Sequence, residues 1–93
     1  MIFEWDEAKN RINIEKHGIG FEEAKLLFEM PHLRSFTRHD HGEIREISIG
    51  EIYEILIIVV IHTDRDGIIR IISARKASKK ERSLYYDHIK KTD

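Results

Sequence analysis

The chain has 93 residues, no cysteine and a formal net charge of −1. This length allows one domain, over residues 1–93, and the lack of cysteine excludes disulfides and thiolate metal sites. Residues 1–6 lack the features of a signal peptide, and the apolar run 55–61 is far shorter than the roughly 20 residues that span a bilayer, so we expect a cytoplasmic protein without membrane contact.

A short strand and a helix are expected first. Residues 2–5 alternate apolar and polar side chains, as a strand does. Asp6 is a typical helix N-cap, and the helix should end near Lys16. Ala8 and Ile12 would share one apolar face of this helix.

A second helix is expected after Gly18, which suits the left-handed position at the end of the first. Apolar residues then recur at a spacing of three and four, which predicts a helix that ends at Pro31. These apolar residues are Phe21, Ala24, Leu27 and Phe28.

The second half of the chain reads as strands followed by one helix. The strands are expected at residues 33–38, 44–50, 54–62 and 68–74, with turns at 50–51 and 64–67. The connections are too short for crossovers, so the strands should pair antiparallel. A last helix is expected over 78–89. The order β-α-α-β-β-β-β-α predicts a small α+β domain, with an antiparallel sheet packed against helices.

Basic residues concentrate at the junction of the last strand and the last helix. Residues 1–63 carry 7 Lys or Arg and 12 Asp or Glu, whereas residues 64–93 carry 9 and 5. Cations at a helix N-terminus oppose the helix dipole, and together with its free N–H groups they can bind phosphate. Ser78 and Glu81 fit a capping box, so Glu81 is either a cap or a general base beside a phosphate.

Other cations are expected on a sheet face and a helix face. Arg45 and Arg70 alternate with isoleucines, so each must pair with a carboxylate, such as Glu46 or Glu54, or open into a groove that receives a phosphate. A second strip of phosphate contacts, or a solvated salt-bridged face, is formed by Lys9, Asn13 and Lys16.

Metal and cofactor signals are weak. The loosely spaced residues 39–41 (His-Asp-His) could bind a metal but are more typical of a polar loop. His62 ends the apolar strand and is either a core-edge imidazole or an acid–base candidate. The sequence contains no Gly-rich phosphate loop and no nicotinamide fingerprint, so no cofactor is expected.

Short motifs along nearly the whole chain together suggest a family. They are Phe3–Asp6, Lys9, Asn13, Lys16–Gly18, Phe21–Ala24, Phe28, Arg45, Ile49–Gly50, His62–Arg65, Arg70–Ala77, Glu81–Arg82 and Tyr85. In this order and spacing they resemble the BrnT-type toxin family.

The resemblance implies a ribonuclease toxin of a type II toxin–antitoxin pair, with a RelE-like fold. It implies RNA cleavage that arrests translation without a metal, the ribose 2′-hydroxyl attacking the adjacent phosphate. The implied partners are an mRNA substrate, an antitoxin with a ribbon-helix-helix DNA-binding domain, and operator DNA bound through the complex.

The resemblance also implies a site. The catalytic residues would be Arg65, Arg70, Arg75, Glu81 and Arg82. The RNA-binding residues would be Lys9, Lys76, Lys79 and Lys80. The basic side chains would stabilise charge on the pentacoordinate phosphate, and Glu81 or His62 would take the proton of the 2′-hydroxyl.

Two other functions remain open at the level of sequence. One is a non-catalytic module that docks an antitoxin and co-represses its own operon. The other is a small metal-dependent hydrolase that uses His39, Asp40 and His41.

Overall fold

The computed structural model describes residues 1–38 and 44–91. The element order agrees with the sequence prediction, except that the second helix continues as a 3-10 helix. The elements are β1 (Ile2–Glu4), α1 (Glu7–His17), α2 (Phe21–Ala24), η1 (Lys25–Glu29), β2 (Leu33–Arg38), β3 (Ile44–Ile52), β4 (Leu56–Arg65), β5 (Ile68–Lys76) and α3 (Lys79–Lys91). Among these described elements, no helix is long and apolar enough to cross a membrane.

The strands form one sheet in the order β1-β5-β4-β3-β2. Strands β2 to β5 form the expected antiparallel meander. Strand β1 instead pairs parallel with β5, so the sheet is mixed rather than wholly antiparallel. The α+β class is confirmed, but the alternation of residues in β1 could not reveal which edge it joins or in which direction.

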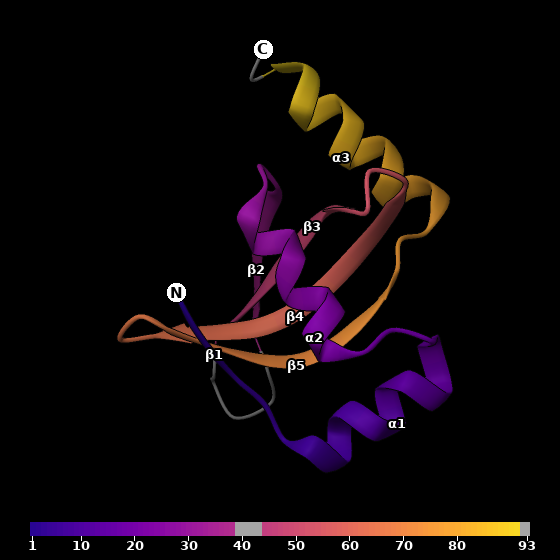
Figure 1. The fold of residues 1–93 in the computed structure, drawn as a ribbon. Helices are drawn as coiled ribbons and strands as arrows, with labels where there is room; N and C mark the ends of the chain where they lie inside the picture. The colour runs from indigo at the N-terminus through magenta and orange to yellow at the C-terminus, as the bar shows by residue number, and fades with distance from the viewer. Residues whose placement is uncertain (39–43, 92–93) are drawn as a thin grey trace.

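Two hydrophobic clusters lie on opposite faces of the sheet. Even-numbered β4 residues such as Ile58 and Val60 pack with the α2 and η1 side chains, whereas Ile57 and Val59 pack with Tyr85 of α3. Strand β4 is therefore buried on both faces, as its continuous apolar run predicts. Figure 1 shows α2 over the strands and α3 beside one end of the sheet.

Helix α1 has the expected caps but not the expected buried face. Asp6 accepts hydrogen bonds from the first turn, and Gly18 has φ +73° at the other end. The predicted apolar face is wrong, because Ala8 is exposed and Ile12 is 60% exposed, while Asn10 and Asn13 are buried. The helix is held by amide hydrogen bonds, which hydrophobic periodicity does not detect.

Asn13 binds the edge of β5. Its amide nitrogen donates to the carbonyl oxygens of Ile19 (2.8 Å) and Ala74 (2.7 Å), and its amide oxygen accepts from the Ala74 N–H (3.2 Å). The side chain thus satisfies both backbone groups of Ala74, at a place on β5 beyond the last residue paired with β1. This bonding fixes α1 against the sheet.

The turn between β3 and β4 lies three residues beyond the predicted one. Gly50 is buried within β3, and a Cβ atom there would lie 2.8 Å from Leu27 Cγ, so this glycine permits close packing on η1. The turn uses Tyr53 (φ 55°) and Glu54 (φ 61°). Two successive non-glycine residues in the left-handed region carry strain of roughly 1–2 kcal/mol each. The second turn, at Asp66 and Gly67, lies within the predicted range.

Candidate active site

Three of the predicted arginines share one face of the sheet. Arg70 lies opposite Thr63 of β4, and Arg75 lies opposite Val59. Thr63, Val59 and Arg65 are separated by even numbers of residues on β4, so all three project from the same face. We call the surface formed by Arg65, Arg70, Arg75, Thr63 and Ser73 the arginine face.

A β-bulge brings Arg70 and Arg75 onto that common face. Their separation of five residues would place them on opposite faces of a regular strand. In the pairing of β4 with β5, however, Ile61 lies opposite Ser73 and His62 lies opposite Ile71, which leaves Ile72 as an extra residue. The two arginines are therefore four pairing steps apart, or roughly 13 Å along the strand.

Helix α3 covers only one end of this face. On β4 the exposure rises steadily from the α3 end, because Ile57 and Val59 are buried, Ile61 and Thr63 are partly exposed, and Arg65 is exposed. Half-buried Arg45 and Ile47 follow the same trend on β3. The uncovered part of the face thus combines guanidinium groups with hydroxyl and apolar side chains.

Arg75 and Glu81 form a two-point salt bridge within the site. The Arg75 Nη1 and Nη2 atoms donate to Glu81 Oε1 at 2.7 Å and Oε2 at 2.8 Å. This two-point bridge, helped by the Ser78 N–H and hydroxyl, lowers the pKa of Glu81 to about 2. The same bridge raises the pKa of Arg75. Both charges are therefore fixed at neutral pH.

Glu81 also completes the predicted capping box. Ser78 N–H donates to Glu81 Oε1 at 2.8 Å, and Glu81 N–H donates to Ser78 Oγ at 3.2 Å. Cap and salt bridge share one carboxylate, so the start of α3 and the Arg75 guanidinium are positioned together. Arg82 lies one residue further on and donates to the Ala77 carbonyl at 3.2 Å. We call Arg75, Ser78, Glu81 and Arg82 the strand–helix junction.

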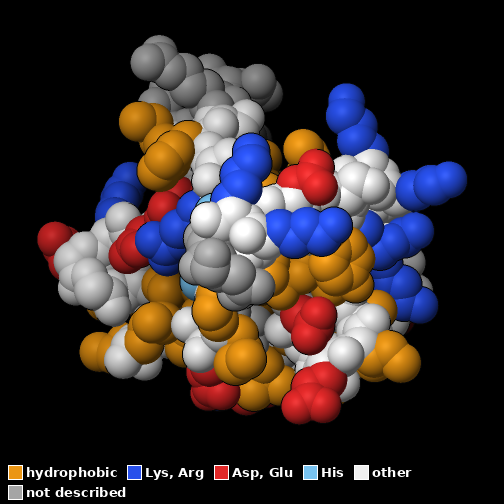
Figure 2. Space-filling model, turned by 90° about the horizontal axis from the view of Figure 1, so that it is seen from above, with side chains coloured by type: hydrophobic (Ala, Val, Ile, Leu, Met, Phe, Trp, Pro, Cys, Tyr) orange, Lys and Arg blue, Asp and Glu red, His pale blue; other side chains and the backbone are white. Residues whose placement is uncertain are grey.

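The predicted lysines flank this junction in different ways. Lys79 and Lys80 are exposed in the first turn of α3. Lys76 pairs with Ile58, whose side chain belongs to the α2 side, so Lys76 projects from the face opposite the arginines. Figure 2 shows one group of basic side chains at the right of the view, with others across its centre and left, and acidic side chains beside an apolar surface at the lower edge.

Lys9 lies close to β5 between the two ends of the arginine face. It lines a shallow groove with Lys16, His17, Ile72 and Ser73. Asn13 lines the floor of this groove, but its amide is committed to Ile19 and Ala74. Of the three residues predicted as a strip of phosphate contacts on α1, only Lys9 and Lys16 therefore extend toward solvent.

Arg70 and Arg65 lie at the far end of the face. Arg70 forms an ion pair with Glu4 at 3.4 Å, and both side chains are about half exposed. Such exposed pairs contribute little to stability, so an incoming phosphate can replace the carboxylate. Arg65 is exposed at the end of β4, diagonally across from Arg70. The predicted residues therefore form an elongated surface rather than one cluster.

His62 is fully buried and lies away from the arginine face. Its Nε2 atom hydrogen-bonds Ser48 Oγ at 2.8 Å, and its ring meets Phe28 edge-on. Burial, and then the charge of Arg34, lower the pKa of His62 to about 4. It is a neutral core imidazole at pH 7, which agrees with the structural reading of this residue and leaves it no contact with a substrate.

A polar group around the buried His62 was not recognised in the sequence. Glu46 lies 3.9 Å from His62 Nδ1, and Arg34 lies 3.7 Å from both Glu46 and Asp64. These residues come from β2, β3 and β4, and only the strand register brings them together. His62 and Glu46 are buried on the α2 side, whereas Arg34 and Asp64 are exposed, so the group lies on the face opposite the arginine face.

No group of three His, Asp or Glu side chains within 1–38 and 44–91 is placed to hold a metal ion. The predicted residues His39, Asp40 and His41 lie outside the described residues.

Comparisons with known proteins find a related family and a related fold. The family model described as "Ribonuclease toxin, BrnT, of type II toxin-antitoxin system" matches residues 5–81. The crystal structure of the Brucella abortus ribonuclease toxin BrnT is similar, with a TM-score of 0.69 and 35% sequence identity over 85% of this chain and 100% of that one. Comparison with individual curated proteins finds no match.

Proposed function

Because the chain belongs to the BrnT family of ribonuclease toxins of type II toxin–antitoxin systems, we propose that it binds RNA along the arginine face and cleaves it at the strand–helix junction. The observation that carries the proposal is the common orientation of Arg70 and Arg75. Guanidinium groups bind phosphate oxygens at two points, and charge neutralisation dominates the affinity for nucleic acid.

The RNA strand runs from Arg65 and Arg70 toward α3. Partly exposed Thr63 and Ser73 offer hydroxyl groups to ribose and phosphate, while Lys9 approaches β5 from the side. Lys79 and Lys80 bind phosphates beyond the junction, at the N-terminus of α3. Lys76 projects from the opposite face of the sheet, so it reaches the RNA only around the end of the sheet.

Cleavage is metal-independent in this proposal and uses the RNA's own 2′-hydroxyl. The 2′-oxygen loses its proton and attacks the adjacent phosphorus, and the bond to the 5′-oxygen breaks. The departing 5′-oxygen takes a proton from water, so that a 2′,3′-cyclic phosphate and a 5′-hydroxyl result. Arg75 and Arg82 stabilise the negative charge that develops on the pentacoordinate phosphate. Preorganised cations of this kind account for a large part of phosphoryl-transfer rates.

Glu81 has two successive roles. In the free protein it holds Arg75, and its pKa of about 2 makes it a weak proton acceptor. A phosphate that binds Arg75 competes for the same guanidinium and releases the carboxylate. Once released, the carboxylate has a pKa nearer its ordinary value and can take the 2′-hydroxyl proton.

The partners follow from the family. We propose that the toxin arrests translation in the cytoplasm by cutting mRNA, and that its cognate antitoxin carries a ribbon-helix-helix DNA-binding domain. The complex would hold operator DNA through the antitoxin. The mechanism resembles that of RelE-like ribonucleases.

The test is cleavage of bulk RNA by the purified chain in EDTA, with Arg75→Ala, Arg82→Ala and Arg11→Ala alongside. Arg11 is exposed on α1, so the Arg11→Ala substitution removes the same charge at a position away from the site. We expect the two junction variants to lose at least about 100-fold in rate and Arg11→Ala to match the parent.

The products and the failures are equally informative. A 2′,3′-cyclic phosphate on the 5′ fragment supports attack by the 2′-hydroxyl. Equal cleavage by all variants would show that the site is elsewhere. Uncut RNA with every protein, together with tight binding of the antitoxin, would favour the non-catalytic docking module.

A further inference from the structure

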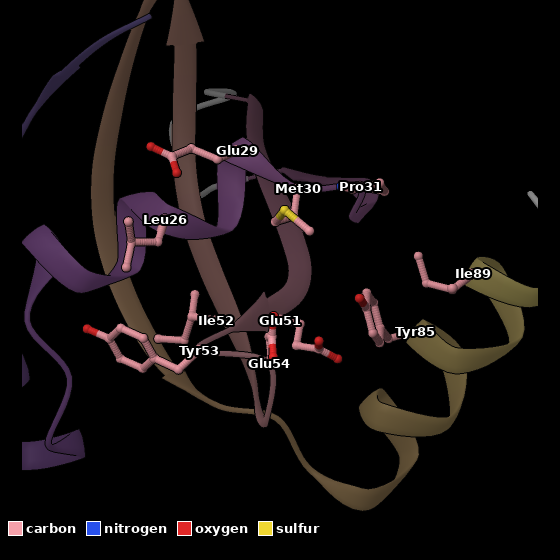
Figure 3. Close-up of a pocket in the computed structure, with 10 residues that line it drawn as sticks. All are labelled: Leu26, Glu29, Met30, Pro31, Glu51, Ile52, Tyr53, Glu54, Tyr85 and Ile89. Atoms are coloured by element: carbon pink, nitrogen blue, oxygen red, sulfur yellow. The ribbon is translucent and has the colours of Figure 1, made fainter.

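A second surface lies on the other side of α3, away from the arginine face. It is a pocket of about 430 Å³ between η1, the β3–β4 turn and α3. Figure 3 shows Tyr85 and Ile89 of α3 on one side and Met30 and Leu26 on the other, with Ile52 below. A pocket of this size accommodates one or two large side chains of a partner.

The pocket has an apolar floor and an acidic rim. Leu26, Met30, Ile52 and Ile89 supply apolar surface, while Glu29, Glu51 and Glu54 lie around it. None of its ten lining residues is Lys or Arg. Carboxylates repel RNA phosphates, so this pocket and the arginine face suit partners of opposite charge.

Tyr85 reflects the electrostatic character of the pocket. It is only 6% exposed, and burial, followed by the nearby Glu51 carboxylate, raises the pKa of its hydroxyl. A positive charge that enters beside the half-buried Glu51 would therefore meet both a carboxylate and a phenol. Electrostatic attraction is stronger there than on the open surface.

The rim of the pocket includes the strained turn. Tyr53 and Glu54 both have positive φ, and the Tyr53 hydroxyl donates to Glu23 at 3.0 Å. Bulky residues persist in the left-handed region where surrounding contacts hold them, and such places are often functional. Here the conformation sets Tyr53 and Glu54 side by side at the edge of an apolar pocket. Exposed Met30 extends the apolar surface.

We propose that this pocket is the docking site of the cognate antitoxin, which inserts an apolar side chain flanked by Lys or Arg residues. This rests on the proposed function, since it takes the antitoxin as the partner. The three glutamates of the rim attract a segment that carries Lys or Arg beside its apolar residue. Apolar contact with Met30, Tyr53 and Ile89 supplies the burial that charge alone does not.

Docking here also brings the partner close to the catalytic residues. Tyr85 lines the pocket and follows Arg82 by three residues, about 4.5 Å along the axis of α3. A segment seated in the pocket can extend across the first turn of α3 toward the strand–helix junction. Neutralisation of the toxin then needs no movement of the arginine face, because the bound chain blocks access to its end.

The test compares two double charge reversals by isothermal titration calorimetry with purified cognate antitoxin. The pocket variant is Glu51→Lys with Glu54→Lys, and the control is Glu15→Lys with Glu22→Lys. Both change the net charge equally, and Glu15 and Glu22 are exposed on other elements. We expect the pocket variant to bind at least ten-fold more weakly, with a smaller salt dependence, and the control to stay within two-fold of the parent.

A third variant tests the apolar contact. Met30→Ser removes an exposed side chain, so the fold should survive while the antitoxin affinity falls about five-fold. Unchanged circular dichroism and thermal unfolding check each variant. Binding of the pocket variant within two-fold of the parent would overturn the proposal, as would an absence of antitoxin binding by the parent.

The failure of docking is distinct from failure of the proposed catalysis. RNA cleavage by the free pocket variant should equal that of the control, because neither pair touches the arginine face. A parent that binds antitoxin through the pocket but leaves RNA uncut would uphold docking and overturn the ribonuclease site. If the parent cuts RNA while the pocket variant binds antitoxin as tightly as the parent, the docking proposal is overturned and the ribonuclease proposal stands.

Discussion

The Arg75 guanidinium is held by the Glu81 carboxylate through two hydrogen bonds of 2.7 and 2.8 Å. The arginine comes from the last strand and the glutamate from the first turn of the last helix, so the contact joins two elements at their meeting point. In the proposed mechanism the same contact keeps the site inactive until a phosphate competes for the guanidinium.

Replacement of Glu81 by Gln should separate binding from catalysis. An amide binds the guanidinium more weakly than a carboxylate, so Arg75 becomes more available and KM for RNA should fall a few-fold. Because the proton acceptor is lost, kcat should fall by about 100-fold. Single-turnover and steady-state kinetics of the variant measure both effects.

Glu22→Gln, on the exposed surface of α2, is the matched control and should leave both constants unchanged. If Glu81→Gln instead raised KM with kcat unchanged, the carboxylate would have a positioning role only.

Acid should destabilise the protein in a window set by His62. Its pKa is about 4 in the folded state and near 6.5 when unfolded, so the unfolded chain binds a proton first as the pH falls. The stability contributed by the neutral imidazole is full above pH 6.5 and is lost progressively toward pH 4. The loss should be about 2–3 kcal/mol.

Urea unfolding at pH 7 and pH 5 measures this effect. The His62→Gln variant keeps a polar group near Ser48 but does not titrate, so its stability should fall less between the two values. An equal fall in parent and variant would place the effect on other groups. The stability that ionised Glu81 contributes is unchanged between pH 7 and pH 5, because it is lost only as the pH falls from about 4.5 toward the folded pKa of about 2.

Asn13 should matter more for stability than any apolar residue of α1. Asn13→Ala leaves the Ala74 N–H, the Ala74 carbonyl and the Ile19 carbonyl without this partner in a buried place. We expect a loss of about 2–3 kcal/mol in chemical denaturation. Ile12→Ser, on the exposed face, should change stability by less than about 0.5 kcal/mol. A larger effect for Ile12 than for Asn13 would contradict the assignment of the buried face.

Gly50→Ala should destabilise the protein through overpacking. The added Cβ atom would lie 2.8 Å from Leu27 Cγ and 3.0 Å from His32 Cβ, so η1 must shift away from β3. We expect a loss of about 1–3 kcal/mol. A double-mutant cycle with Leu27→Ala should show that the combined loss is smaller than the sum, because the shortened side chain leaves room for the methyl group. Strict additivity would mean that the two residues do not compete for space.

Local signals predicted much of the fold. The capping residue Asp6, the terminal Gly18 and the box of Ser78 with Glu81 each act within a few residues, and the structure has all three. The antiparallel meander followed from turn chemistry and short connections. These features depend on neighbours in the chain, which a sequence displays directly.

Features that depend on distant parts of the chain were not predictable in the same way. The parallel pairing of β1, the burial of Asn13 and the close packing at Gly50 each require a partner far along the sequence. The family resemblance predicted which residues belong to the candidate site. Regular strand alternation, however, would place Arg70 and Arg75 on opposite faces, because it does not reveal the extra residue between them. The two-point bridge to Glu81 was likewise hidden behind its role as a cap.

The extra residue Ile72 turns an odd separation into an even one. Successive side chains of a strand point to opposite faces. Two side chains therefore share a face only if their separation in residues, not counting bulge residues, is even. A relative with both arginines and no bulge would need them four or six residues apart. When relatives are aligned, a one-residue gap inside the last strand would therefore move one of the two arginines to the opposite face of the sheet, and it carries more meaning there than a substitution of Ile71 or Ile72.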